Sequence, residues 1–336
     1  MEKKNEEILL KYGASTVKIG EMLKYNENIF QAFSNNENVE DEEFIEVWNL
    51  YKKEAELYGA YFTLSKYIPQ LHFAIREGVS QSNEYRDVTL RGKPILDICN
   101  MDEFELAEPD ELELDIYSTH EGHIPILFTP NNSDFEKLVR ALAGGNEPIE
   151  IPDTMGAYMV TGYNNWDRIR RDNVKCTKAN KEIYQDRFII LSNNFYRGIT
   201  PEQVGMNEKE WRKVSFIMHR ARECMHYVTL RLFGSMQNEV QDEIVADFFA
   251  MLEAVGEYKP VWALLFLGLE NDRGNPPLSE SSFHISNKKA LDAVINLTSL
   301  YLNNKESLHS EQGKIDFLKK LKSSSLEEIA KGFSII

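Results

Sequence analysis

Cysteine is scarce in this chain of 336 residues, which holds only Cys99, Cys176 and Cys224. Three widely spaced cysteines cannot form the dense disulfide framework of a small secreted protein. Free thiols are typical of proteins that are kept in a reducing compartment. We therefore expect a cytoplasmic protein.

Long apolar runs and positive charge are also in short supply. The longest apolar run, Val261–Leu269, is far shorter than the ~20 residues that cross a bilayer. The segment Met1–Glu7 has no apolar core of the kind that a signal peptide needs. Lys and Arg number 38 against 54 Asp and Glu, a net charge of −16. Because the longest apolar run is so short, we expect no membrane association. Because nucleic-acid binding needs clustered cations, we also expect no nucleic-acid partner.

Several catalytic motifs are missing from the sequence. No glycine-rich loop of the Walker or dinucleotide type is present, and no nucleophile elbow indicates a serine hydrolase. A di-iron helix bundle needs two Glu-x-x-His motifs, and the chain has one. What it does have is an ordinary globular composition, 42% hydrophobic and 27% charged, with enough length for a sizeable core.

An acidic stretch lies in the first half of the chain. Between Lys93 and Lys137 there is no Lys or Arg, yet there are twelve Asp and Glu residues. One interpretation is a docking surface for a basic protein partner. The other is a solvated edge and loop that keep the protein soluble.

The pattern of apolar residues predicts an α+β, predominantly helical protein with a small mixed or antiparallel sheet. Helical spacing covers Asp41–Tyr67, and a further helix over Asp134–Ala143 has Ser133 as its expected cap. Short β-rich segments separated by turn residues predict the strands, which are Leu71–Ile75, Arg86–Leu90, Leu112–Tyr117 and Ile124–Phe128. A linker-like segment around residue 150 suggests two lobes, 1–153 and 154–336.

The segment Gly156–Asp167 is rich in Gly, Asn and aromatic residues. Such a segment could line a pocket, but we prefer a strand and turn leading into a helix that begins at Trp166. On this interpretation Arg168, Arg170 and Arg171 form a solvated basic turn.

A long helix is expected from Asn207, a suitable N-cap, to about Phe233. At about 100° per residue, the polar residues His219, Arg222, Glu223 and His226 fall on one stripe. Apolar residues bound that stripe at both ends, so it is unlike a merely solvated face.

A second helix should run from Gln237 to Val255, after a stop at Gly234. Glu243 and Asp247 share a stripe on it with small alanines. If the two helices fold back as a hairpin, equal steps from the turn place His226 level with Glu243 and Arg222 level with Asp247.

Together these residues form a Glu-x-x-His on one helix and a Glu-x-x-x-Asp on the next, which resembles the gluzincin metallopeptidases. The resemblance covers about thirty residues. It implies that Glu223 matches the general base, His226 and Glu243 match zinc ligands, and Asp247 matches the carboxylate behind them. It also implies a peptide or protein as substrate or partner.

The sequence departs from that family at Arg222, which stands where the first His of His-Glu-x-x-His belongs. A catalytic zinc needs three protein ligands, and His226 with Glu243 supplies two. His219 lies too far along the helix to substitute, so it is peripheral.

Three interpretations stay open. Arg222 has replaced the metal, in a non-catalytic protein that binds a partner; a working zinc site uses an unusual ligand set with Glu223 as base; or the match is coincidental on two ordinary amphipathic helices.

Overall fold

The computed structural model describes residues 40–95, 104–172, 184–234, 239–268, 283–324 and 329–330. They fall into two compact units, one within Asn38–Cys224 and one within Met225–Ile336. We call them the sheet unit and the helical unit. One helix, α10 (Glu208–Phe233), supplies residues to both.

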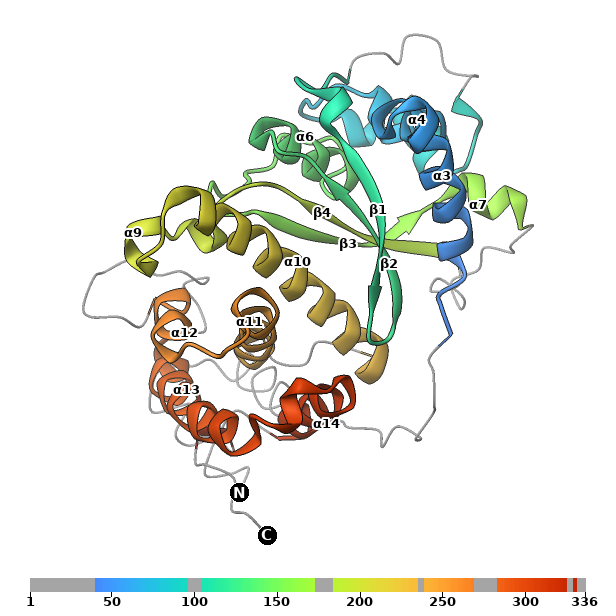
Figure 1. Cartoon of the computed structure of the whole chain (residues 1–336). Helices are drawn as coiled ribbons and strands as arrows, with labels where there is room; N and C mark the ends of the chain where they lie inside the picture. The colour runs from blue at the N-terminus through green and yellow to red at the C-terminus, as the bar shows by residue number, and fades with distance from the viewer. Residues whose placement is uncertain are drawn as a thin grey trace, which may run out of the picture. The chain divides into compact units, whose positions relative to one another are not determined.

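The sheet unit is built on a mixed four-stranded sheet with the strand order β1-β2-β4-β3 (Figure 1). Its strands are β1 (Glu113–Thr119), β2 (Gly122–Phe128), β3 (Ala157–Asn164) and β4 (Gln185–Leu191). β1 pairs with β2 as an antiparallel hairpin, β2 runs parallel to β4, and β3 is antiparallel to β4. The predicted fold class, predominantly helical α+β with a small sheet, is confirmed.

Helices cover both faces of this sheet. Side chains from α3 (Phe44–Tyr58), α4 (Ala60–Tyr67) and α6 (Asn132–Leu142) share one core with Leu127 of β2 and Phe188 of β4. The first part of α10 packs on the opposite face, where the rings of Phe216 and Phe128 meet edge-on at 5.0 Å between centroids. Because β2 and β4 are covered on both faces, their apolar runs are almost continuous.

The predicted helix over Asp41–Tyr67 is real but broken. Gly59 separates α3 from α4, with φ 86° and ψ 148°, a conformation that is nearly restricted to glycine. The helix expected at Asp134 is α6, and its cap is Asn131, whose side chain accepts from the Asp134 N–H at 3.2 Å, rather than Ser133.

Two of the four predicted strands are wrong. Leu71 and His72 lie in a 3-10 turn, η1 (Pro69–His72), that begins with proline. Arg86–Leu90 falls largely in helix α5 (Asn83–Thr89), which Ser82 caps by accepting from the Tyr85 N–H at 3.2 Å. In both places a local helix-start signal, a proline or a capping serine, overrides the β preference of Phe, Val and Ile.

The described part of the sheet unit also contains short helices. They are η2 (Val79–Gln81), η4 (Pro109–Glu111), α7 (Trp166–Arg171), η6 (Tyr196–Gly198) and α9 (Pro201–Val204). The strand, turn and helix expected around Gly156–Asp167 are confirmed as β3, the capping residue Asn165 and α7.

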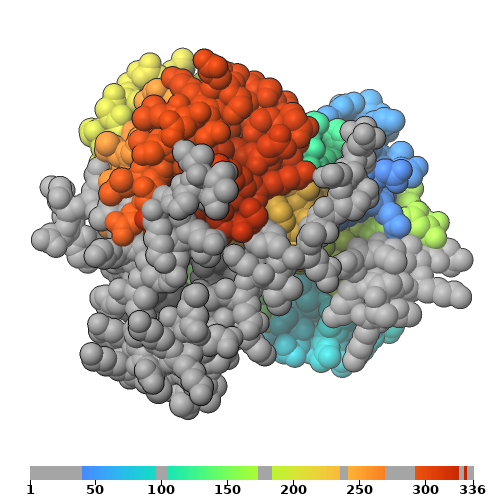
Figure 2. Space-filling model, turned by 90° about the horizontal axis from the view of Figure 1, so that it is seen from below, coloured from blue at the N-terminus to red at the C-terminus, as the bar shows by residue number. Residues whose placement is uncertain are grey.

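The helical unit packs around Phe248 of α11 (Glu239–Val255). The ring of Phe248 lies 4.9 Å from that of Tyr258 and 5.3 Å from that of Phe317, between centroids. The other helices that the structure describes in this unit are α12 (Pro260–Phe266), α13 (Phe283–Asn304), η7 (Ser307–His309) and α14 (Glu311–Lys322). Figure 2 shows the surface that α13 and α14 form, in orange to red.

Among the described residues, no helix has the length and apolar character needed to cross a membrane. The expected boundary between 153 and 154 differs from the division into compact units, which falls between Cys224 and Met225. β3 and β4 follow residue 153 but join β1 and β2 in one sheet, because strand pairing outweighs the linker-like composition of that segment.

Candidate functional site

Helix α10 forms as the sequence predicts. Asn207 caps it by accepting from the Glu210 N–H at 2.9 Å. Its end is Gly234, whose N–H donates to the Leu230 carbonyl at 2.8 Å while φ is 71°. The side of α10 that carries Met218 and Val228 is buried. Cys224 is a buried free thiol, as expected.

The polar stripe of α10 is buried as well. His219, Glu223 and His226 are all buried. Charged and polar groups at such depth need partners, because taking an unpaired charge out of water costs several kcal/mol. The partners of each residue therefore define what the site can do.

Arg222 and Glu223 form an ion pair between neighbouring residues of α10 in the sheet unit. The Glu223 side chain is 7% exposed and that of Arg222 is 22% exposed. The guanidinium thus holds the carboxylate that the sequence matched to a general base. The carboxylate that a zincin directs at a metal-bound water is here directed at a guanidinium instead.

His226 and Glu243 are brought together in the helical unit. The Nε2 atom of His226 lies 3.6 Å from the Glu243 Oε1 atom, with side chains 8% and 15% exposed. The register counted from the turn predicted this pairing. α11 begins at Glu239, and the expected start at Gln237 lies outside the described residues.

Asp247 is also buried, at 2% exposure, one turn after Glu243 on α11. Its charge adds to the effect of burial in raising the pKa of Tyr258. The carboxylate therefore lies inside the helical unit, close to the aromatic cluster of Phe248.

The residues do not fit a catalytic zinc site. A catalytic zinc takes three protein ligands and a water. In the part of the chain that the structure describes, no group of three or more His, Cys, Asp or Glu side chains is arranged to hold a metal. His226 and Glu243 are two donors, and the residue at the position of the first ligand, Arg222, is a cation.

His219 is a buried neutral side chain in the sheet unit. Burial and then the charge of Arg222 lower its pKa to about 3. Its Nε2 atom faces Gly156, where an added Cβ would lie 2.2 Å away. Its ring lies 4.9 Å from that of Tyr196, between centroids. His219 therefore packs the start of β3 and the loop after β4 against α10.

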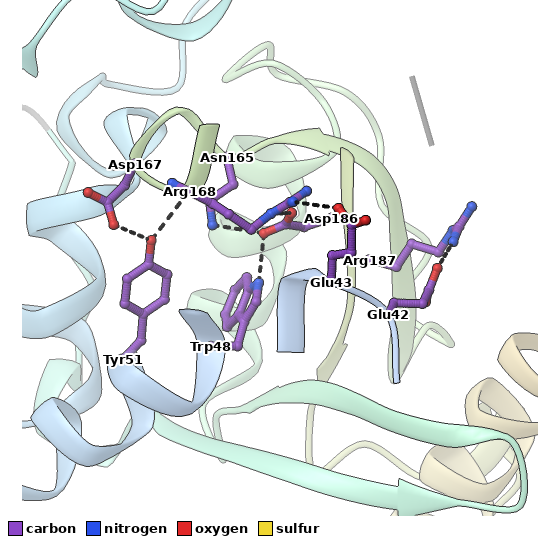
Figure 3. Close-up of polar contacts among 9 residues, drawn as sticks. All are labelled: Glu42, Glu43, Trp48, Tyr51, Asn165, Asp167, Arg168, Asp186 and Arg187. Atoms are coloured by element: carbon purple, nitrogen blue, oxygen red, sulfur yellow. Dashed lines mark hydrogen bonds and ion pairs between the residues drawn. The ribbon is translucent and has the colours of Figure 1, made fainter. Parts of the chain in front are cut away.

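Sequence reasoning missed a second polar cluster, in the sheet unit (Figure 3). Its centre is Asp186 of β4, which is fully buried. The Oδ1 atom of Asp186 accepts from Arg168 Nε at 2.8 Å, and its Oδ2 atom accepts from Trp48 Nε1 and Asn165 Nδ2, both at 2.8 Å. Burial raises the pKa of the Asp186 carboxyl, and the Arg168 charge opposes that rise.

Arg168 corrects the prediction of a solvated basic turn, because its side chain is 1% exposed. Tyr51 extends the cluster, since its hydroxyl donates to Asp167 Oδ2 at 2.9 Å. At the opposite end of Figure 3, Arg187 pairs with Glu42. Figure 3 shows these side chains reaching one another from α3, α7 and β4. The sequence did hold one signal for this cluster, which is Asp186 itself. It is an acidic residue beside an apolar run, and an acid buried at such a position needs a cation as its partner.

The acidic stretch is only partly solvated. Asp134 is fully buried at the start of α6, where its oxygens accept from the N–H groups of Ala107 and Glu108 at 2.7 and 2.8 Å. His123 of β2 contacts Asp41 with its Nδ1 atom at 2.9 Å.

In the part of the chain that the structure describes, the fold is predominantly helical α+β, with the Arg222–Glu223 pair and the Asp186 cluster in the sheet unit and the His226–Glu243 pair in the helical unit. The chain belongs to DUF7005, a family of unknown function, whose model matches residues 7–332. Neither a curated protein nor a solved structure matches it.

Proposed function

We propose that this protein is a non-catalytic relative of zincin-like metallopeptidases, a pseudoenzyme that binds a peptide or protein partner. The observation that carries the proposal is the ion pair between Arg222 and Glu223. The residue at the position of the first zinc ligand is a cation, and it pairs with the residue at the position of the general base.

This arrangement provides the charge balance that a metal would otherwise provide. A buried carboxylate stays ionised only when a cation or several donors compensate it. Arg222 supplies that cation to Glu223 permanently, because a guanidinium does not lose its proton in proteins. The His226–Glu243 pair supports the same proposal, since it preserves two of the metal-binding residue types in contact.

Sparse cysteines and a buried free Cys224 support a cytoplasmic protein.

An active metal-dependent hydrolase with Glu223 as base remains the competing function, and an interaction protein that uses its acidic stretch is a further one. The Arg222–Glu223 pair favours the pseudoenzyme over both.

Unfolding in urea tests the role of Arg222. Arg222→Ala should leave the buried Glu223 carboxylate without its cation and lower the free energy of unfolding by about 3–5 kcal/mol. The double variant Arg222→Ala with Glu223→Gln removes the charge as well, so it should recover most of that loss. The matched control is Glu223→Gln alone.

A neutral effect of Arg222→Ala would overturn the proposal. So would stoichiometric metal in the purified wild-type protein together with a hydrolytic activity that Glu223→Gln abolishes while the metal stays bound.

A further inference from the structure

Helix α13 carries apolar residues on two opposite sides. The side that is buried in the helical unit consists of Ala293, Val294, Leu297 and Tyr301. The Tyr301 ring lies 6.1 Å from that of Phe248, between centroids. At about 100° per residue, Ile295, Ser299 and Leu302 fall on the other side, within a sector of about 60°. We call these three residues the outer stripe of α13.

The outer stripe is exposed, and α13 lies at the surface of the helical unit (Figure 2). Ile295 is 55% exposed and Leu302 is 65% exposed. The exposed side of α14, by contrast, carries Asp316, Lys319 and Lys320. A surface helix is normally polar on the side away from its core, and a helix that is apolar all round is normally buried. α13 therefore has the character of a helix that is covered on both sides.

The outer stripe also lies in an uncharged segment of an acidic chain. No Asp, Glu, Lys or Arg occurs from Ala293 to Asn304, although the net charge of the whole chain is −16. Two strongly acidic molecules repel each other least where their contacting surfaces carry no charge. This segment is therefore suited to contact with another acidic molecule.

The polar side chains beside the stripe already have hydrogen-bond acceptors. The Thr298 hydroxyl donates to the Val294 carbonyl at 2.9 Å, and the Asn296 amide donates to the Ala330 carbonyl at 2.6 Å. A buried donor without an acceptor is costly. Covering this side of α13 would leave neither of these donors without an acceptor.

The spacing along the outer stripe is self-complementary. In an antiparallel pair of α13 helices related by a two-fold axis, the axis would lie level with Thr298 and Ser299. Equal steps from that point place Ile295 of each copy level with Leu302 of the second copy. At 1.5 Å per residue, both apolar residues lie about 5 Å from the axis along the helix. The small Ser299 between them lets the two helices approach closely.

The same register gives charge complementarity at both ends of the stripe. Asp292 is half-buried beside the stripe, and Lys305 is the exposed residue that follows α13. Equal steps place Asp292 of each copy level with Lys305 of the second copy. The Lys305 ammonium lies 6.0 Å from the centre of the Tyr301 ring, at the outer limit of a cation–π interaction. Like charges at these two positions would disfavour the arrangement, and the sequence has opposite ones.

We propose that the outer stripe of α13 is a contact surface for a second copy of this chain, with the two helices antiparallel. The self-complementary register favours a second copy over an unrelated protein, because both members of every contact come from the same helix. A contact centred on one helix is small beside the ~800 Å² per partner of a typical stable interface. We therefore expect a reversible dimer with a Kd on the order of 10 µM.

Sedimentation velocity on the full chain, at concentrations from about 1 to about 200 µM, tests this surface. The wild type should pass from monomer to dimer over that range. Leu302→Asp places a carboxylate at each apolar contact, so it should raise the Kd at least about tenfold. Leu57→Asp is the matched control, because Leu57 is a leucine of the sheet unit that is 76% exposed, and it should leave the Kd unchanged.

Charge reversal tests whether the partner is a second copy in this register. Asp292→Lys sets a lysine level with Lys305 of the second copy, and Lys305→Asp sets an aspartate level with Asp292. Each single variant should raise the Kd about three- to tenfold. The double variant restores opposite charges at both ends, so its Kd should return to within about twofold of the wild type. Without contact between the two positions, the two effects would simply add.

The inference is overturned if the wild type stays monomeric over the whole range, including the case in which a different protein covers the stripe. It is equally overturned if Leu302→Asp and Leu57→Asp weaken the dimer alike, or if the double charge variant is no better than the single ones. Circular dichroism checks that each variant is folded.

This inference goes beyond the proposed function and does not rest on it. Every variant keeps Arg222 and Glu223, so a monomeric wild type would leave the pseudoenzyme proposal standing. A neutral Arg222→Ala would end that proposal and leave the dimer standing.

Discussion

Asp186 lies beside an apolar run of β4, and both of its carboxylate oxygens accept hydrogen bonds from buried donors. One acidic residue thereby joins Trp48 of α3 and Arg168 of α7 to the sheet. At such a buried site, removing the cation alone destabilises the protein far more than replacing both members of the ion pair.

Arg168→Met should therefore lower the free energy of unfolding by about 3–5 kcal/mol, because it leaves Asp186 buried without its cation. Urea denaturation followed by tryptophan fluorescence measures this change. Arg170→Ala, on the exposed side of the same helix, should stay within about 0.5 kcal/mol of wild type. Equal losses in the two variants would mean that the Asp186–Arg168 pair contributes nothing particular.

At the scale of elements, helix caps and long-range partners determine which helices and contacts can be predicted from the sequence. α10 and α11 were predictable because each has a long helical period and clear stop signals. α5 was not, because a short segment with Val and Thr looks like a strand until Ser82 is recognised as its cap.

Arg168 was missed for a different reason. Its burial depends on Asp186, eighteen positions later in the sequence, and a single sequence does not show which acid a given arginine meets. The His226–Glu243 pair was found because a helix hairpin links spacing to contact directly.

His219 joins three elements, and its protonation should make their packing depend on pH. Its pKa is lowered to about 3 in the folded protein, whereas an unfolded histidine titrates near 6.5. Between these values only the unfolded chain binds the proton. The free energy of unfolding should consequently fall as pH drops below about 6.5, by at most about 1.4 kcal/mol per pH unit from this residue.

The measurement is the urea midpoint at several pH values between 7 and 5, in the wild type and in His219→Gln. The variant lacks the titrating group, so its stability should fall less steeply with decreasing pH, whatever its stability at pH 7. Parallel curves for the two proteins would show that His219 is not the group responsible.

At the scale of the whole molecule, the fold class followed from composition and periodicity, while the division into units did not. The helical second half was expected, but β3 and β4 belong to the same sheet as β1 and β2. Pairing between distant strands is a long-range choice that local composition around residue 150 cannot reveal.

The central claim is that Arg222 stands where a metal ligand would stand and supplies its charge. Zinc titration by calorimetry, on the wild-type protein and on Arg222→His, tests it most directly. The variant restores His-Glu-x-x-His on one helix, with two imidazoles one turn apart. The account predicts no zinc binding by the wild type and binding by the variant. Stoichiometric zinc on the wild type, or none on a folded Arg222→His protein, would contradict it.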